Sequence, residues 1–274
     1  MQPAQPKKLT PIRKTYIWGT EDWMLSWFNE GLEDVPLLIK IIKAREALSV
    51  QVHPGNAFAE EKEHKSGKTE MWYVLDCEPG AYLYYGLKHK ISEDEFRKRI
   101  QNQTILEVCR KMPVKKGDVF YIPAGLLHAI GAGITVAEIQ QSSDVTYRVY
   151  DYNRENANHE KRPLHIEKAA LVAGFMPPLA GHRPMGPRIR KNGYSRTLLV
   201  QCPYFVVQLY EISESMTGDT AGGFQSLLIL EGEGVLKTGF GEMALAAGDS
   251  IYLPKETGDY QIIGTLQLLR STAE

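Results

Sequence analysis

The first feature of this sequence that could take part in chemistry is a histidine that follows a tight turn at the end of a strand. In residues 117–128 (GDVFYIPAGLLH), a run of β-forming residues is stopped by Pro123 and turned by Gly125, and His128 follows. Proline cannot donate a hydrogen bond to a strand ladder, so the strand would end there and aim the imidazole at a fixed point. Because imidazole is the commonest metal ligand, we expect His128 to belong to any metal site in this protein.

Further potential ligands lie on two other predicted strands. In residues 48–54 (LSVQVHP), side chains alternate between the two faces, so Gln51 and His53 share one face and the apolar residues share the other. The next predicted strand, residues 69–75 (TEMWYVL), carries Glu70 near its start. A carboxylate on an apolar strand needs a partner if it is buried. These strands therefore offer a carboxamide, an imidazole and a carboxylate.

The elements that must position these side chains are mostly strands. Short runs of apolar and β-branched residues between glycine and proline turns indicate an all-β chain. The hydrophilic residues 55–68 are interpreted as a solvated loop. Two capping boxes, at residues 92–95 and 104–107, predict two short helices between residues 93 and 112, which would form a helical insert. One more short helix is expected at residues 164–172.

A repeated heptapeptide indicates that the chain is built from two copies of one β-barrel. GDVFYIP at 117–123 returns as GDSIYLP at 248–254, late in each half of the chain. Only the first copy is followed by a histidine, so only the first half is expected to hold a metal. Proline and glycine are frequent between the halves, as in a linker. The predicted organisation is a catalytic domain at 1–174 with the helical insert at about 92–112, a linker at 175–188, and a degenerate domain without a metal site at 189–274.

Charge and composition argue against several classes of partner. The 32 Lys and Arg residues balance 33 Asp and Glu residues, for a net charge of −1. No global basic field would therefore attract nucleic acid or an acidic membrane. No apolar run reaches the length of a membrane span, and the N-terminal residues lack the apolar core of a signal peptide. Three widely spaced cysteines without CxxC are typical of a reducing compartment. We expect a cytoplasmic monomer or homodimer that acts on a small solute.

Four ordered motifs resemble a known enzyme family. The pattern G-x5-P-x-G-x2-H, filled by residues 117–128, resembles the second motif of the cupin superfamily of small jelly-roll β-barrels. Together, the motifs resemble type I mannose-6-phosphate isomerases in their shorter bacterial form, over nearly the whole chain. The resemblance implies two cupin-type barrels and reversible aldose–ketose isomerisation of mannose 6-phosphate and fructose 6-phosphate through a cis-enediol. The motifs are QVHP at 51–54, GKTEMWYVL at 67–75, GDVFYIPAGLLHAI at 117–130 and SDVTYRVYDYNR at 143–154.

The resemblance also implies a metal-ligand set. In the family, one zinc ion is held by the Gln and His of QxH, the Glu of the TEMWY-like strand and the His after the PAG turn. Carried over, these ligands are Gln51, His53, Glu70 and His128. Two imidazoles and two oxygen donors suit zinc, although they also fit Fe(II), Mn(II) or Co(II). We therefore expect one zinc ion per chain.

Three catalytic candidates follow from the same resemblance. Arg148 matches an arginine that the family treats as catalytic, and it could stabilise enediolate charge or bind the phosphate. Glu138 lies ten residues past the histidine of the PAG turn, where related enzymes place an acid. Lys68, two residues before the expected carboxylate ligand, is the other candidate for proton transfer. Many relatives have a histidine where Gly67 stands, so the role of that histidine is vacant here.

Two other functions fit part of the pattern. A metal-dependent sugar-binding protein could use the same barrels, but it would not need the three catalytic candidates, and no DNA-binding helix pair is appended. An Fe(II) cupin oxygenase normally has three protein ligands and open coordination positions, which Gln51 as a fourth ligand argues against. For Asp151, a role in sugar-ring opening and a plain salt bridge to Arg154 are both open.

Overall fold

The computed structural model describes residues 5–155, 158–179 and 181–273, and its chain divides into two compact units. The unit that carries the predicted ligands, called the site unit below, comprises Arg13–Asp22 and Ile41–His182. The other, the C-terminal unit, comprises Met1–Ile12, Trp23–Lys40 and Arg183–Glu274. Among the described residues, no helix is long and apolar enough to span a membrane.

This grouping differs from the expected first domain at residues 1–174. The strand β1 (Lys7–Leu9) pairs antiparallel with β19 (Ser250–Leu253), so a segment near the start of the chain belongs with its last third. Such a pairing joins residues more than 230 positions apart and leaves no signal in the local sequence. Residues 1–4, 156–157, 180 and 274, which fall within the expected domains and linker, lie outside the described residues.

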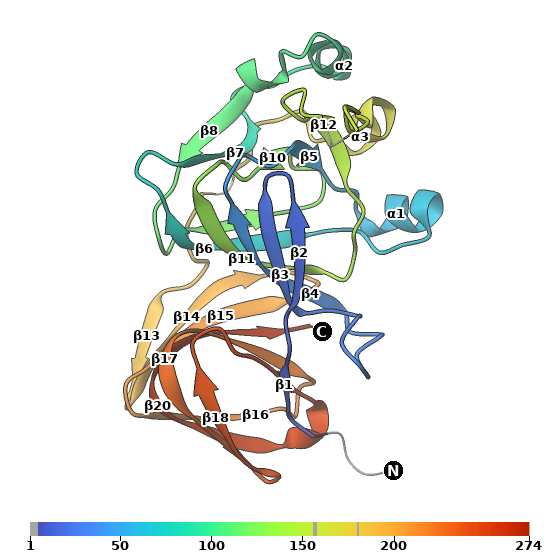
Figure 1. The fold of residues 1–274 in the computed structure, drawn as a ribbon. Coiled ribbons are helices and arrows are strands. Elements are labelled where there is room, and N and C mark those ends of the chain that lie inside the picture. Colours follow the sequence, from blue (N-terminus) through green and yellow to red (C-terminus); the bar gives the residue numbers. More distant parts are fainter. Residues whose placement is uncertain (1–4, 156–157, 180, 274) are drawn as a thin grey trace. The chain divides into compact units, whose positions relative to one another are not determined.

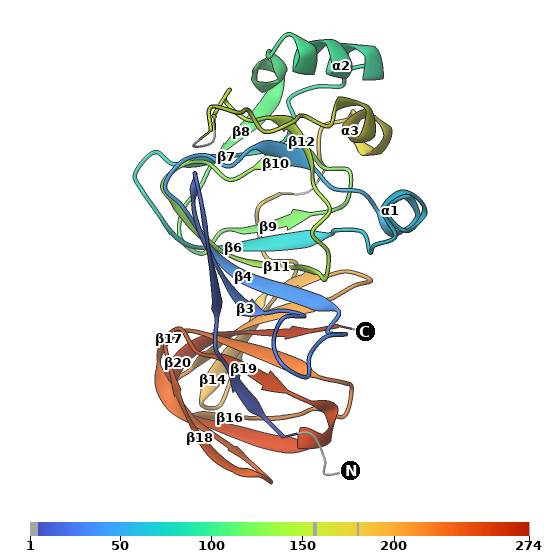
Figure 2. The same cartoon turned by 45° about the vertical axis from the view of Figure 1, so that its right-hand side comes forward.

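Two antiparallel sheets face each other in the fold around the predicted ligands (Figures 1 and 2). The five-stranded sheet has the order β12 (Tyr147–Tyr150), β5 (Val50–Val52), β10 (His128–Ala129), β7 (Tyr82–Leu87) and β8 (Cys109–Pro113). The six-stranded sheet has the order β2 (Ile12–Tyr16), β3 (Gly19–Leu25), β4 (Leu37–Ala44), β11 (Ile134–Gln141), β6 (Glu70–Cys77) and β9 (Val119–Ile122).

Alternating side chains build one apolar core on each face of the five-stranded sheet. On one face, Val50 and Val149 pack with residues of α2 (Glu93–Gln101) and α3 (Ile166–Val172). Figures 1 and 2 show both helices on the side of this sheet away from β6 and β11. On the other face, Tyr85 packs with Trp72, Val74, Phe120 and Val136 between the two sheets. The predicted ligands point into this second space.

The predicted helical insert is half confirmed. The helix α2 begins as the capping box predicts, because Ser92 Oγ accepts a hydrogen bond from Glu95 N at 3.1 Å. The second predicted helix is wrong. Thr104 makes no side-chain capping bond, and only the 3₁₀ turn Ile105–Glu107 forms before β8 begins at Cys109. Pairing of β8 with β7 satisfies this backbone instead, and a local pattern cannot reveal that partner.

The prediction of a loop at residues 55–68 is also wrong. Residues Asn56–Glu63 form the helix α1, which starts without a side-chain capping bond. Only Ala59 of this helix is buried, so the helix has no apolar stripe that a periodicity search could detect. The helix at the end of the site unit, α3, agrees with the one expected at residues 164–172.

The C-terminal unit contains one large antiparallel sheet around its own apolar core. The strand β16 (Ser215–Asp219) pairs with β20, β18 (Gly241–Ala246) pairs with β17, and the 3₁₀ turn Lys255–Thr257 follows β19. The expected linker, where described, has no strand before Arg188. The main path of the sheet runs β1, β19, β17 (Gln225–Thr238), β20 (Asp259–Thr272), β15 (Val206–Ile212), β14 (Tyr194–Gln201) and β13 (Arg188–Lys191).

The repeated heptapeptide forms the same turn twice. Gly117 and Gly248 have φ angles of 89° and 91°, a left-handed conformation that glycine adopts without strain. In each copy the following aspartate accepts a hydrogen bond from the backbone N–H three residues before it, Lys115 N in the first and Ala246 N in the second. A four-residue strand then follows in each copy, β9 and β19. The two halves therefore share this local structure.

The fold is mostly β, as predicted, but the two expected barrels are not confirmed. The strands of the described residues are arranged in three sheets, and their hydrogen-bonded order closes into no complete barrel.

Candidate metal centre and active site

Strand register brings the predicted ligands to the space between the five-stranded and the six-stranded sheet. In the five-stranded sheet, Gln51 of β5 pairs directly with His128 of β10 on one side and with Arg148 of β12 on the other. Directly opposed residues project to the same face, and His53 shares that face with Gln51 by alternation. In the six-stranded sheet, Glu70 and Glu138 lie on one face, because their cross-strand partners are Gln140 and Trp72.

Two imidazoles and a carboxylate converge in this space. His53, Glu70 and His128 each offer a ligand atom, and these atoms lie within 4.8 Å of one another. The Nε2 atom of His53 is 3.5 Å from Glu70 Oε2, and that of His128 is 3.4 Å from Glu70 Oε1. All three residues are buried. A buried cluster of this kind has the donor set of a zinc site.

Backbone carbonyls orient both imidazoles toward the carboxylate. His53 Nδ1 lies 2.9 Å from Val145 O, and His128 Nδ1 lies 2.8 Å from Leu126 O. Each Nδ1 therefore carries the proton, which leaves a lone pair on each Nε2, as a metal-binding histidine requires. The Nε2 of His53 also lies 3.0 Å from Lys68 Nζ. Burial lowers the pKa of His128 to about 3, so this imidazole is neutral near pH 7.

An unsatisfied buried atom supports a metal at this position. Among the described residues, the Nε2 atom of His128 has no hydrogen-bond partner, although it is buried. Leaving a buried acceptor unpaired is costly, and a cation between the imidazoles and the carboxylate would remove that cost. The residues present therefore fit a bound zinc ion.

Lys68 lies directly beside the candidate ligands. Its Nζ atom is 2.7 Å from Glu70 Oε2 and 3.0 Å from His53 Nε2, and the residue is only 5% exposed. An amine so close to the cluster can exchange protons with a substrate held there. Lys68 is therefore in direct contact with two of the three clustered ligands.

The helix α1, which the sequence pattern does not reveal, fixes the approach of Lys68 to the cluster. Asn56 Oδ1 accepts hydrogen bonds from Gly67 N at 2.9 Å and from Gln141 Nε2 at 3.0 Å. A Cβ atom at Gly67 would lie 2.6 Å from Asn56 N, which is backbone and cannot move aside cheaply. Close packing against α1 therefore leaves no room for a side chain at residue 67.

The two remaining catalytic candidates have different surroundings. Glu138 is 3% exposed and accepts a hydrogen bond from Trp72 Nε1 at 2.9 Å, while the Trp72 ring meets the His128 ring at 5.4 Å between centroids. Arg148 donates from Nη1 to Pro163 O at 3.0 Å. Burial and then repulsion from Arg162 lower the pKa of Arg148, which as an arginine stays charged.

Asp151 forms the salt bridge to Arg154 that was one of its two expected roles, and a second one to Arg162. Its carboxylate accepts from Arg154 Nη2 at 2.5 Å and from Arg162 Nε at 2.6 Å. Burial by itself raises the pKa of Asp151, but the hydrogen bonds from Arg162 and Arg154 outweigh it and hold the pKa below its ordinary value. Sequence reasoning did not single out Arg162, and its spacing from Asp151 carries no signal.

Asp151→Asn is expected to lower the melting temperature at pH 7 by roughly 2–4 °C, about 1 kcal/mol, because these ion pairs are partly open to solvent. The folded-state pKa of Asp151 lies below its unfolded value. The stabilisation is therefore complete above about pH 4 and is lost as pH falls through the folded-state pKa. Thermal melts should show a smaller difference in melting temperature between the unmutated protein and Asp151→Asn at pH 3 than at pH 7. Asp144→Asn, which removes an exposed pair with Lys65, is the matched control and should change neither melt.

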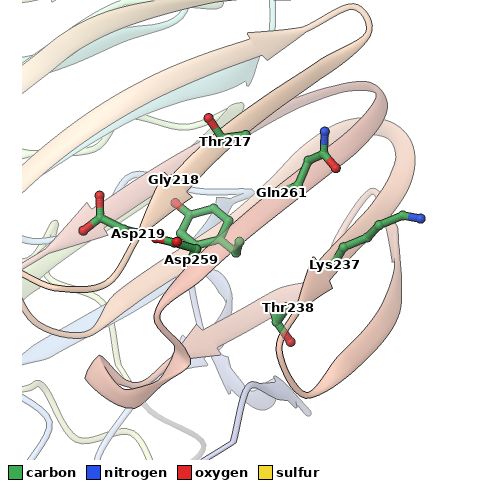
Figure 3. Close-up of a pocket in the computed structure, with 8 residues that line it drawn as sticks. Thr217, Gly218, Asp219, Lys237, Thr238, Asp259 and Gln261 are labelled. Atoms are coloured by element: carbon green, nitrogen blue, oxygen red, sulfur yellow. The ribbon is translucent and has the colours of Figure 1, made fainter.

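A separate surface cavity of about 650 Å³ lies in the C-terminal unit (Figure 3). Polar side chains from the neighbouring strands β16, β17 and β20 line it, and none of the predicted site residues does. This cavity is therefore not the predicted active site, despite its volume. The lining residues are Thr217, Gly218, Asp219, Lys237, Thr238, Asp259, Tyr260 and Gln261.

Comparison with known proteins gives a consistent set of relatives. A model of the mannose-6-phosphate isomerase cupin domain matches residues 195–273. The mannose-6-phosphate isomerase of Streptococcus mutans is 41% identical over 236 residues, which cover 86% of this chain and 73% of that protein. The mannose-6-phosphate isomerase ManA of Bacillus subtilis is 36% identical over 237 residues, covering 86% and 74%.

Solved structures agree with these sequence matches. The crystal structure of the mannose 6-phosphate isomerase from Bacillus subtilis has a TM-score of 0.89 at 31% identity, covering 98% of this chain and 100% of that one. A zinc-bound mannose 6-phosphate isomerase has a TM-score of 0.75 at 13% identity, covering 99% and 100%, and this match shows a likeness of fold alone. From the sequence identity and coverage of its relatives, the chain belongs to the mannose-6-phosphate isomerase family.

Proposed function

We propose that this protein interconverts mannose 6-phosphate and fructose 6-phosphate by moving a proton between C2 and C1 through a cis-enediol. The observation that carries the proposal is the buried cluster of His53, Glu70 and His128 with Lys68 Nζ 2.7 Å from the carboxylate. Family membership supports the same reaction. Simple sugar binding would not require a buried lysine in contact with the metal ligands.

One zinc ion per chain would be held by His53, Glu70 and His128, with Gln51 as the fourth ligand. Support for Gln51 comes from its register, since it lies directly opposite His128 and shares a face with His53. When bound, zinc would act as a Lewis acid that polarises the sugar carbonyl and acidifies the neighbouring C–H.

The protein's own groups would bind the substrate and move the proton. Lys68 is the favoured proton-transfer group because its Nζ lies within 3.0 Å of two candidate ligands, whereas one oxygen of Glu138 already accepts from Trp72. Glu138 is the second candidate for this role. The Arg148 guanidinium would stabilise the negative charge of the enediolate or bind the phosphate.

The organisation that accompanies this proposal is a pair of cupin-type barrels, with a catalytic domain at 1–174, a linker at 175–188 and a degenerate domain without metal at 189–274. The shared turn of the repeated heptapeptide and the cupin-domain match at 195–273 support it. Three free thiols, at Cys77, Cys109 and Cys202, support a cytoplasmic location. The protein would act as a monomer or homodimer, with a small phosphorylated sugar as its partner.

A coupled assay on the metal-loaded protein tests the function. Mannose 6-phosphate is mixed with protein of known zinc content, and fructose 6-phosphate formation is followed. We expect turnover that a chelator abolishes and that added zinc restores. A protein with one zinc per chain that produces no fructose 6-phosphate would refute the proposal.

A further inference from the structure

We propose that His165 is a positioning residue for Arg148, and that together with Pro163 it forms a clamp that fixes this arginine for the reaction. The inference rests on the proposed function, because Arg148 needs catalytic alignment only if the protein is an isomerase.

Three hydrogen bonds join Arg148 to the clamp. Arg148 N donates to His165 Nδ1 at 3.0 Å, and His165 N donates to Arg148 O at 2.8 Å. Arg148 Nη1 donates to Pro163 O at 3.0 Å. The strand β12 is the edge of its sheet and pairs with β5 on one side only. On the open side of β12, the ring and backbone of His165 make the hydrogen bonds to the backbone of Arg148 that a neighbouring strand would otherwise make.

The clamp is anchored at both of its ends. On the N-terminal side, Arg162 donates to Asp151 Oδ2 from Nε at 2.6 Å and to Oδ1 from Nη2 at 2.5 Å. On the C-terminal side, His165 O accepts from Ala169 N at 2.8 Å, which ties it to the first turn of α3. Because both ends are held, the clamp can restrict the position of Arg148 and does not simply move with it.

The contact with Arg148 N requires a neutral imidazole whose Nδ1 is unprotonated. The charged and titratable groups around His165 are Arg148 and Tyr147 on β12, Lys168 on α3 and Glu63 on α1. Burial, followed by repulsion from Arg148 and Lys168, lowers the pKa of His165 and outweighs the opposing effect of Glu63. The surroundings thus favour the form that can accept this hydrogen bond.

Capping of α3, the structural role expected for His165 at this position, does not account for the contacts of its side chain. His165 is the N-cap residue of α3, yet its side chain makes no capping hydrogen bond to the helix. The ring instead accepts a hydrogen bond from Arg148 N, so the imidazole acts on the catalytic candidate and not on the helix that it precedes. Small displacements of a catalytic group can cost up to about 100-fold in rate.

The test compares His165→Ala, which removes the acceptor, with His165→Asn, whose Oδ1 can lie where Nδ1 lies. We expect His165→Ala to lower kcat by about 10- to 100-fold with KM nearly unchanged. Zinc content should stay at one per chain, and His165→Asn should recover most of the lost rate. In an Arg148→Lys background, His165→Ala should have little further effect, because both changes act through the same group.

Several outcomes would overturn the clamp. These are a His165→Ala protein with normal kcat, a folded His165→Asn protein as impaired as His165→Ala, or additive effects in the Arg148→Lys background. Nitrogen NMR of the unmutated protein gives a test that needs no variant, because a protonated Nδ1 of His165 at neutral pH would also refute the inference. If the unmutated zinc-loaded protein shows no turnover, the proposed function fails, whereas normal turnover with an unaffected His165→Ala protein refutes the clamp alone.

Discussion

Replacing His128 with alanine is expected to remove both the bound metal and the turnover. The imidazole is completely buried, and its Nε2 faces Glu70 Oε1 at 3.4 Å without a hydrogen-bond partner in the described structure. Mutating a residue that only hydrogen-bonds to a metal ligand commonly lowers the metal affinity by about 10- to 100-fold. Loss of a direct ligand should lower the affinity by more than that. Zinc per chain is measured by elemental analysis after desalting, and isomerisation by the coupled assay.

A histidine outside the ligand set provides the control for this variant. His182 belongs to the same unit and stacks on Phe120 at 5.6 Å between ring centroids, but it is not among the candidate ligands. His182→Ala should retain zinc and turnover. A His128→Ala protein that still carries one zinc per chain would exclude this residue from the metal site.

The second large effect is expected for Arg148→Ala, which should keep the metal and lose most of the turnover. Removal of a single group that stabilises transition-state charge typically lowers kcat by about 100- to 1,000-fold. Arg148 lies across from Gln51 in the sheet but belongs to no candidate ligand set, so the zinc content should not change. The two variants therefore separate metal binding from charge stabilisation.

Arg13→Ala is the matched control for a lost arginine. Arg13 is exposed and pairs with Asp22 at 2.6 Å on the surface of the site unit. Its loss should leave both zinc and rate unchanged, since exposed ion pairs contribute little. A near-normal rate for Arg148→Ala would remove this residue from the mechanism.

The ligand cluster could be predicted because each member sits in a local pattern. Alternation fixes the common face of Gln51 and His53, and the proline and glycine of the PAG turn end the strand before His128. These are short-range effects of strand geometry. The distances between the three ligands, by contrast, depend on register between strands, which the resemblance implied and the residue pattern alone did not.

What the sequence could not reveal depends on contacts between distant segments. The helix α1 has only Ala59 buried, so it resembles a loop in any pattern of apolar residues. The strand β8 exists because it pairs with β7, and β1 because it pairs with β19. His165 reaches Arg148 across 17 residues through the open edge of β12, and neither residue type nor spacing marks it.

The duplicated turn has a consequence for how the metal site is made. Gly248 and the strand β19 reproduce the geometry of Gly117 and β9 in a copy whose proline is followed by no histidine. Backbone hydrogen bonds and glycine conformation are therefore sufficient to shape the turn before any cation binds. Unlike a zinc finger, which folds only around its ion, this framework should be preassembled in the apoprotein. Zinc would then bind to a preformed site. Its affinity would not be reduced by the free-energy cost of ordering the chain.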